Sequence, residues 1–118
     1  MSRTNSMEMN QLTDPAYYIM LSVLEAKHGY AIMKYIEELT NGDFTIGPAT
    51  LYTLLKKLQN AGFIVQDETD DDRRKTYTAT EKGKALLCSE IKRRKQMVEH
   101  GIEAFKSLKG AGEHDMER

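Results

Sequence analysis

The order of turn-forming and apolar residues between His28 and Thr80 constrains the fold of this chain more than any other feature. Apolar residues recur every three or four positions on either side of Asn41-Gly42, and that pair is typical of a helix end. Two short runs of β-forming residues follow, and Thr80 with Glu81 then has the sequence of a helix start. The predicted elements are, in order, a helix over residues 30–40, a helix over 47–60, a strand over 63–65, a turn over 69–72, a strand over 75–79 and a helix over 81–108.

A further helix is predicted before these elements. Asp14 followed by Pro15 is typical of a helix cap with proline in the first turn, and residues 16–26 carry apolar side chains at helical spacing. Three helices, a hairpin and a fourth helix, in this order, predict a winged helix-turn-helix. The fold class is therefore mainly α with a small β-hairpin. The predicted organisation is a disordered N-terminus over residues 1–10, a winged helix-turn-helix domain over 13–80, a dimerisation helix over 81–108 and a disordered tail over 109–118.

Composition predicts one small core and a cytoplasmic setting. The 118 residues are 40% hydrophobic, which supports one domain rather than two. Cys88 is the single cysteine, so no disulfide can form within the chain, and a reducing compartment is expected. The first nine residues lack the apolar run of a secretory signal, and no segment approaches the roughly 20 apolar residues that cross a bilayer. We therefore predict a cytoplasmic protein with no membrane partner.

The helix over residues 47–60 has the two faces that a DNA recognition helix needs. The apolar stripe that can seat it on the domain consists of Leu51, Leu54, Leu55 and Leu58. Its candidate DNA-facing residues are Pro48, Ala49, Thr50, Tyr52, Thr53, Lys56 and Lys57. Small residues at its start allow a close approach to DNA, its free N–H groups favour a phosphate, and its lysines can bind the backbone further along. An ordinary amphipathic helix with solvated lysines is the alternative interpretation.

The predicted hairpin carries three consecutive basic residues, Arg73, Arg74 and Lys75, at the base of its second strand. Strand alternation sends the first and third to one side and the second to the other, so at least one of them should face DNA. The turn is acidic, and between residues 47 and 80 five acidic residues offset five basic ones. A solvated hairpin with internal ion pairs is therefore the alternative.

The long C-terminal helix carries an interrupted apolar stripe. The stripe residues predicted to form a dimer interface are Leu87, Ile91, Val98, Ile102 and Phe105. Arg94 falls at a stripe position and Gly101 adjoins His100, so polar groups and spare volume are expected near a dimer axis. We therefore predict a small-molecule site at Arg94, Met97 and His100, in which Arg94 favours an anionic ligand. The alternative is that Arg94 reaches out to solvent, Gly101 permits close helix contact, and no pocket forms.

Several short motifs, taken in register, resemble a known family. They are His28-Gly29-Tyr30, Thr50-Leu51-Tyr52, Leu55-Lys56-Lys57-Leu58, Gly62-Phe63-Ile64, Arg73-Arg74-Lys75 with Tyr77, and Thr80-Glu81-Lys82-Gly83. In this unbroken order, over about residues 13–87, the chain resembles the phenolic acid decarboxylase regulator (PadR) family of bacterial and archaeal transcription factors. The resemblance is to the short members with a single C-terminal helix.

The resemblance implies a homodimeric repressor that binds a double-stranded DNA operator and dimerises through its last helix together with its first. It places Tyr17 and Met20 of the first helix in the dimer interface. The residues that match the family's DNA-facing surface are Tyr30, Thr50, Tyr52, Lys56 and the run from Arg73 to Lys75. The chain departs from the family in its Asp-rich wing turn, where glycine is common, and in having no tryptophan, which some small members use to stack flat drugs.

Two other classes of function stay open. The sequence has no nucleophile-elbow serine, glycine-rich phosphate loop or paired histidine motif, so no enzyme activity, cofactor or metal site is predicted. A winged-helix protein-interaction module that does not bind DNA is one alternative, since fold does not fix function. A thiol-based redox regulator that acts through Cys88 is the other.

Overall fold

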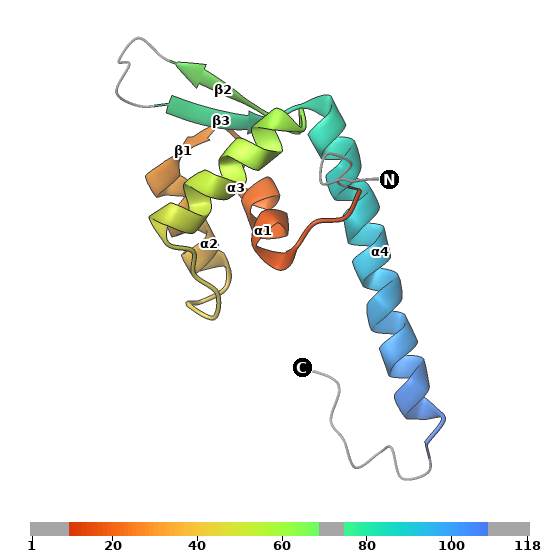
Figure 1. Cartoon of the computed structure of the whole chain (residues 1–118). Coiled ribbons are helices and arrows are strands. Elements are labelled where there is room, and N and C mark those ends of the chain that lie inside the picture. Colours follow the sequence, from red (N-terminus) through yellow and green to blue (C-terminus); the bar gives the residue numbers. More distant parts are fainter. Residues whose placement is uncertain (1–9, 69–74, 109–118) are drawn as a thin grey trace.

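The computed structural model describes residues 10–68 and 75–108, which form a winged helix-turn-helix body and a long C-terminal helix that projects from it (Figure 1). Its elements, in chain order, are α1 (Asp14–Ser22), β1 (Lys27–His28), α2 (Gly29–Leu39), α3 (Pro48–Asn60), β2 (Ile64–Glu68), β3 (Lys75–Ala79) and α4 (Glu81–Lys106). The predicted fold class is confirmed, and α2, α3 and α4 lie within two residues of their predicted bounds. The turn predicted over 69–72 and, apart from Asn10, the disordered ends predicted over 1–10 and 109–118 lie outside the described residues.

Helix α1 begins and ends earlier than its sequence pattern predicts. Thr13, rather than Asp14, is its N-cap, and the Thr13 hydroxyl accepts a hydrogen bond from the backbone N–H three residues on, at 3.3 Å. The helix stops at Ser22, short of its predicted end, because the Val23 carbonyl accepts a hydrogen bond from the Ala79 N–H of β3 at 2.9 Å. A tertiary contact with the sheet therefore ends this helix.

The wing belongs to a three-stranded antiparallel sheet in the order β1-β3-β2. Strand β1 was not predicted, because two residues are too few for an alternating pattern. It is a strand because Lys27 and His28 pair with Tyr77 and Thr76 of β3. Strand β2 starts one residue later and runs three residues further than predicted, since all five of its residues stay paired with β3.

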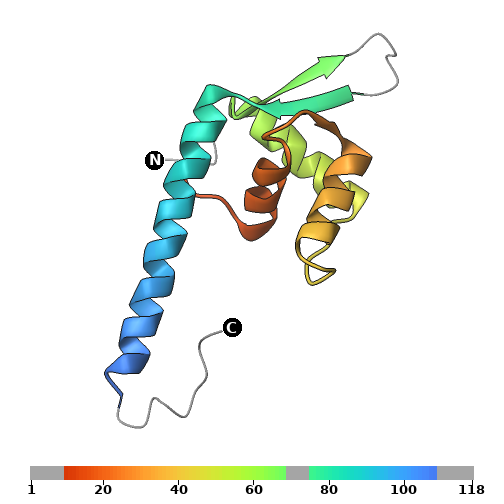
Figure 2. The same cartoon turned by 180° about the vertical axis from the view of Figure 1, so that it is seen from behind.

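The core of the body draws on all four helices and on the sheet. Its buried apolar residues are Leu12, Ala16, Ile19, Met20, Val23, Ile32, Ile36, Ile46, Leu51, Leu55, Leu58, Phe63, Ile64, Tyr77, Ala79 and Leu87. Seen from both sides, α1 lies inside the body and α4 runs along its edge before it extends beyond it (Figures 1 and 2). Within residues 10–68 and 75–108, no helix is long and apolar enough to cross a membrane.

Helix α4 is joined firmly to the end of α3, through contacts that we call the Thr80 joint. The Thr80 hydroxyl caps α4 by accepting a hydrogen bond from the Gly83 N–H at 3.0 Å, and it donates one to the Gly62 carbonyl at 2.7 Å. The Thr80 N–H donates to the Phe63 carbonyl at 3.0 Å. A Cβ at the buried Gly83 would overlap that same carbonyl, so only glycine permits this close approach. The start of α4 is therefore coupled to the C-terminal end of α3.

Candidate nucleic-acid interface

Helix α3 is seated on the body by the leucines of one face. Leu51 and Leu58 are fully buried, Leu55 is almost fully buried, and Leu54 is half-buried. The helix runs along one side of the body from the α2–α3 turn to the start of β2 (Figure 1). Because the leucines occupy one face, the opposite face is open to solvent.

Every residue of α3 that was predicted to contact DNA is exposed. These residues are Pro48, Ala49, Thr50, Tyr52, Thr53, Lys56 and Lys57. The N-cap of α3, Gly47, provides no side-chain hydrogen bond to the first turn. The first N–H groups of the helix are thus left for another acceptor, and the helix dipole favours an anion such as a phosphate at this end. Small side chains at this end allow that acceptor to come close.

The first turn of α2 lies against Tyr52 of α3. Gly29 opens α2, and a Cβ at this position would overlap the Tyr52 hydroxyl, so glycine lets the tyrosine side chain lie against this turn. Tyr52 is 48% exposed, and Tyr30 beside Gly29 is 67% exposed. Burial raises the pKa of the Tyr77 hydroxyl, and the nearby Tyr52 raises that pKa further. The fold therefore brings two exposed tyrosines from separate sequence motifs to the shared edge of α2 and α3.

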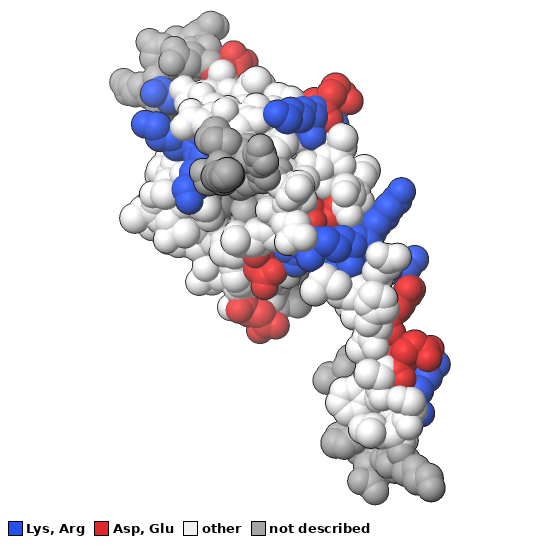
Figure 3. Space-filling view, turned by 45° about the vertical axis from the view of Figure 1, so that its right-hand side comes forward, with Lys and Arg blue, Asp and Glu red and all other residues white. Residues whose placement is uncertain are grey.

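Exposed basic side chains lie along the same part of the body. Among the described residues, neither Lys56 nor Lys57 forms an ion pair, and both are exposed. Lys75 is exposed at the first position of β3, while Arg73 and Arg74 lie outside the described residues. In the space-filling view, Lys and Arg side chains gather on the body beside the hairpin and again where α4 leaves the body (Figure 3). The near-neutral chain thus has locally basic surface.

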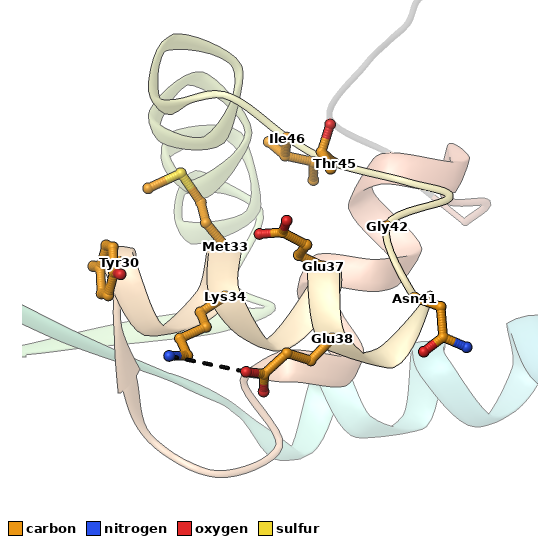
Figure 4. Close-up of a pocket in the computed structure, with 9 residues that line it drawn as sticks. All are labelled: Tyr30, Met33, Lys34, Glu37, Glu38, Asn41, Gly42, Thr45 and Ile46. Atoms are coloured by element: carbon orange, nitrogen blue, oxygen red, sulfur yellow. Dashed lines mark ion pairs between the residues drawn. The ribbon is translucent and has the colours of Figure 1, made fainter.

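An open hollow, which the sequence did not indicate, borders this face. It lies between α2 and the α2–α3 turn (Figure 4), and its lining residues are Tyr30, Met33, Lys34, Glu37, Glu38, Asn41, Gly42, Thr45 and Ile46. Lys34 and Glu38 form an ion pair of 3.9 Å on its rim, with both side chains more than half exposed. Tyr30 belongs both to the hollow and to the exposed edge of α2. Because Glu37 and Glu38 also line the hollow, their carboxylates limit the basic surface on this side.

The predicted dimer residues of α4 and α1 divide into two groups. Ile91, Val98 and Phe105 are 44%, 60% and 39% exposed, and Ile102 and Tyr17 are half-buried. Met20 is fully buried and Leu87 is 3% exposed, both within the core of the same protomer. The prediction was wrong for these two residues, because the first turns of α4 pack on α1 and leave neither side chain a surface for a partner.

The predicted ligand residues do not form one site. Arg94 points back to the body, where its Nη1 lies 2.9 Å from Asp14 Oδ1 and its Nη2 donates to the Leu12 carbonyl at 2.8 Å. These contacts contradict the alternative that Arg94 reaches out to solvent, while its contact with a ligand near a dimer axis stays a prediction. Met97 is exposed and its sulfur accepts a hydrogen bond from Arg93, while His100 lines a shallow hollow on the outer part of α4.

Glu90 is a buried carboxylate that sequence analysis missed. It is 1% exposed and accepts hydrogen bonds from Arg93 Nε at 2.6 Å, Arg93 Nη2 at 2.8 Å and the Leu12 N–H at 2.7 Å. The hydrogen bonds from Arg93 hold the pKa of Glu90 below its ordinary value, against burial, with help from the Leu12 N–H and the charges of Arg93 and Arg94. The signal in the sequence was a glutamate three residues after Leu87, followed by arginines three and four residues later.

An amphipathic helix with an exposed polar face, held between a preceding helix and a three-stranded winged sheet, defines the class of winged helix-turn-helix proteins. Within this class, the chain belongs to the PadR-like family of transcriptional regulators, which it matches over residues 20–89. The family predicted from the sequence motifs is thus confirmed.

Two relatives show the extent of the similarity. The transcriptional regulator YqjI of Escherichia coli is 33% identical over 88 residues, which are 73% of this chain and 42% of YqjI. A protein of Lysinibacillus sphaericus is 36% identical over 78 residues, which are 63% of this chain and 72% of that protein. The chain therefore spans less than half the length of YqjI.

Solved structures share the same fold. Bacillus subtilis PadR in complex with operator DNA has a TM-score of 0.60 and 28% identity, over 66% of this chain and 46% of that chain. A transcriptional regulator of Clostridium thermocellum has a TM-score of 0.62 and 25% identity, over 75% of this chain and 96% of that chain. The PadR-like protein of Eggerthella lenta, with a TM-score of 0.63 and 22% identity, supports the fold alone.

Proposed function

We propose that this chain is a sequence-specific DNA-binding transcriptional regulator that acts as a homodimeric repressor. The observation that carries the proposal is the exposed face of α3, which combines small residues and free N–H groups at its start with two exposed lysines further along. Such a face can enter a major groove while its lysines bind phosphates. The DNA-bound structure of Bacillus subtilis PadR supports the same use of this fold.

Homodimer formation is supported by the outer part of α4. Val98 and Ile102 continue the apolar stripe of Ile91 onto a stretch that projects from the body, and a Cβ at Gly101 would meet no atom from another part of the described chain within 4 Å. An apolar stripe of this kind on a projecting helix fits a second copy of the same helix. Two bodies joined in this way would present two recognition helices, for half-sites about one helical turn apart.

DNA binding is tested with operator fragments selected from random DNA by the purified protein. If a dimer neutralises about six phosphates, the logarithm of affinity should fall with the logarithm of salt concentration at a slope of about −5. Lys56→Ala should reduce that slope by about 2 for the dimer, whereas Lys92→Ala on the exposed side of α4 should leave it unchanged. A protein-interaction module would give no salt-sensitive mobility shift, and an unchanged slope for Lys56→Ala would contradict the proposed surface.

The dimer is tested by light scattering on a matched pair of variants. Val98→Asp places a charge in the proposed interface, while Gln96→Asp makes the same addition on an exposed position nearby. We expect Val98→Asp to be monomeric at micromolar concentration and to lose operator affinity, and Gln96→Asp to stay dimeric. A parent protein that is monomeric while it binds its operator would contradict the proposal.

The proposed repressor also responds to a small molecule bound between paired α4 helices. Met97 and His100 are exposed on the outer part of α4 and are the candidate contacts, whereas Arg94 is already bonded to Asp14. A ligand that prefers the non-binding arrangement by about 2.7 kcal/mol would lower operator affinity about a hundredfold. Thermal-shift screening with phenolic acids and other small anions tests this response. If the compounds that release the operator do not stabilise the protein in the thermal-shift assay, the proposed response is contradicted.

A further inference from the structure

Two residues of α4, one turn apart, hold both backbone polar groups of Leu12. The Leu12 N–H donates to Glu90 Oε1 at 2.7 Å, and the Leu12 carbonyl accepts from Arg94 Nη2 at 2.8 Å. Leu12 itself is 3% exposed and belongs to the core of the body. We call this arrangement the Leu12 clamp, because it fixes the segment before α1 against the middle of α4.

Charged contacts on both sides hold the Leu12 clamp in one geometry. Arg93 binds Glu90 through two hydrogen bonds, of 2.6 and 2.8 Å. Arg94 Nη1 lies 2.9 Å from Asp14 Oδ1. The Cζ of the Arg94 guanidinium lies over the Tyr17 ring, 4.3 Å from the ring centroid. Each arginine therefore has its planar group fixed by at least two contacts, which a flexible lysine could not reproduce.

The clamp lies at the outer end of the contact between α4 and the body. Beyond Arg94, every α4 residue is exposed except the half-buried Ile102. Helix α4 thus has polar contacts with the body at two places, the Thr80 joint at its start and the Leu12 clamp, on either side of the buried Leu87. At about 1.5 Å per residue, Gly83 and Arg94 are about 16 Å apart along the helix. Two such points fix the direction of a helix, whereas one point would let it pivot.

A small change at the clamp has a large effect at the end of α4. A displacement of about 1.5 Å at the clamp turns the helix by about 5°, which over its length of about 39 Å moves one end relative to the other by about 3.5 Å. That distance is the rise of one base pair, about 3.4 Å. In a dimer joined through α4, the direction of this helix would therefore decide how far apart the two recognition helices lie.

We propose that the Leu12 clamp sets the angle of α4 against the body and thereby the separation of half-sites that the dimer prefers. Glu90 and Arg94 are then specificity-determining positioning residues, although neither lies on the DNA-facing surface. The inference rests on the proposed function of the chain as a dimeric DNA-binding regulator.

The angle of α4 is tested without DNA by distances between two spin labels in one protomer. Thr45→Cys and Glu103→Cys provide exposed label sites on the body and on outer α4, in a Cys88→Ser background diluted with unlabelled protein. Arg94→Gln should broaden or shift the distance distribution. The matched control is Lys95→Gln, which removes the same charge from the neighbouring exposed position. Arg94→Lys keeps the charge but not the two-armed contact, and should shift the distances even if Arg94→Gln loses its fold.

The preferred separation is tested with operators in which two identical half-sites are moved apart or together by one and two base pairs. The parent and Lys95→Gln should prefer one separation by at least about tenfold, and both Arg94 variants should reduce that preference to less than about threefold. Affinity for a single half-site should stay the same, which a general loss of folding would not allow. Unchanged distances and an unchanged preference in both Arg94 variants would overturn the clamp. A parent protein that binds no DNA would instead overturn the proposed function, together with the spacing role.

Discussion

Replacing Gly29 with alanine should lower the affinity for DNA and leave the free energy of unfolding nearly unchanged. A Cβ at Gly29 would overlap the Tyr52 hydroxyl, so one of the two groups has to move. Gly29 is buried in the first turn of α2, while Tyr52 is nearly half exposed and its side chain can rotate into solvent. We therefore expect the substitution to displace Tyr52 from its place against the first turn of α2, and to leave the body intact.

The two effects differ in size. Rotating Tyr52 away from a preferred conformation costs about 0.5–1.5 kcal/mol, and alanine favours the helix over glycine by up to about 1 kcal/mol, so the free energy of unfolding should change by less than about 1 kcal/mol. A hydrogen bond from a tyrosine hydroxyl to a charged phosphate contributes about 1.5 kcal/mol or more. In the proposed dimer, each Tyr52 hydroxyl would donate one such bond to a DNA phosphate, and loss of both bonds would cost about 3 kcal/mol, which is about a 150-fold loss of operator affinity.

Fluorescence anisotropy with a labelled operator measures the affinity, and urea unfolding of the same samples measures the free energy of unfolding. The matched comparison is a double-mutant cycle of Gly29→Ala and Tyr52→Ala, in which the double variant should bind like Tyr52→Ala alone. If Gly29→Ala causes the same loss of affinity with and without the Tyr52→Ala substitution, its effect does not pass through the tyrosine, and this reasoning is refuted.

Three other substitutions test separate parts of the structure. Glu90→Gln should lower the free energy of unfolding at pH 7. Folding depresses the pKa of Glu90. The difference in the free energy of unfolding between the parent and Glu90→Gln should therefore be complete above the unfolded pKa of about 4.3 and shrink as pH falls through the lower folded pKa. Equal differences by urea unfolding at pH 7 and pH 3 would contradict this. Gly83→Ala should lower stability in thermal unfolding by about 1–3 kcal/mol, because its Cβ meets the Phe63 carbonyl, and an unchanged melting temperature would contradict this close approach. Cys88→Ser should leave operator affinity unchanged with and without oxidant, and an oxidant effect that depends on the exposed Cys88 would favour the thiol-based alternative.

Elements with strong local signals could be predicted from the sequence. The two ends of α3 have local signals in the sequence: Pro48 at its start, and the glycine that follows Asn60 and Ala61 at its end. Strand β1 and the end of α1 depend instead on residues distant in the sequence. Lys27 is in a strand because it pairs with Tyr77, and α1 stops where Val23 bonds to the sheet. No local pattern contains these contacts.

The candidate site shows the same division. Helical periodicity correctly predicted the exposed face of α3, but it could not predict that Tyr52 lies against Gly29 of another helix. Periodicity also cannot distinguish an apolar stripe that packs on its own body from one left for a partner. Leu87 and Val98 have the same place in the pattern, yet the first is buried and the second is 60% exposed.

Glu90 and Arg94 give α4 a single register on the body. A slip of α4 by about one turn would bring Glu90 to the apolar position that Leu87 now fills, without Arg93 or the Leu12 N–H as partners. Leaving a buried charge unpaired costs about 3–5 kcal/mol, whereas exchanging one leucine for another along a uniform stripe would cost little. Since Arg94 also has to meet Asp14 and the Leu12 carbonyl, a slip in either direction breaks contacts that no neighbouring residue can replace. Arg94, which interrupts the apolar stripe of α4, therefore fixes the place of the helix on the body together with Glu90, and the exposed Val98 beyond them suits the second copy that we propose.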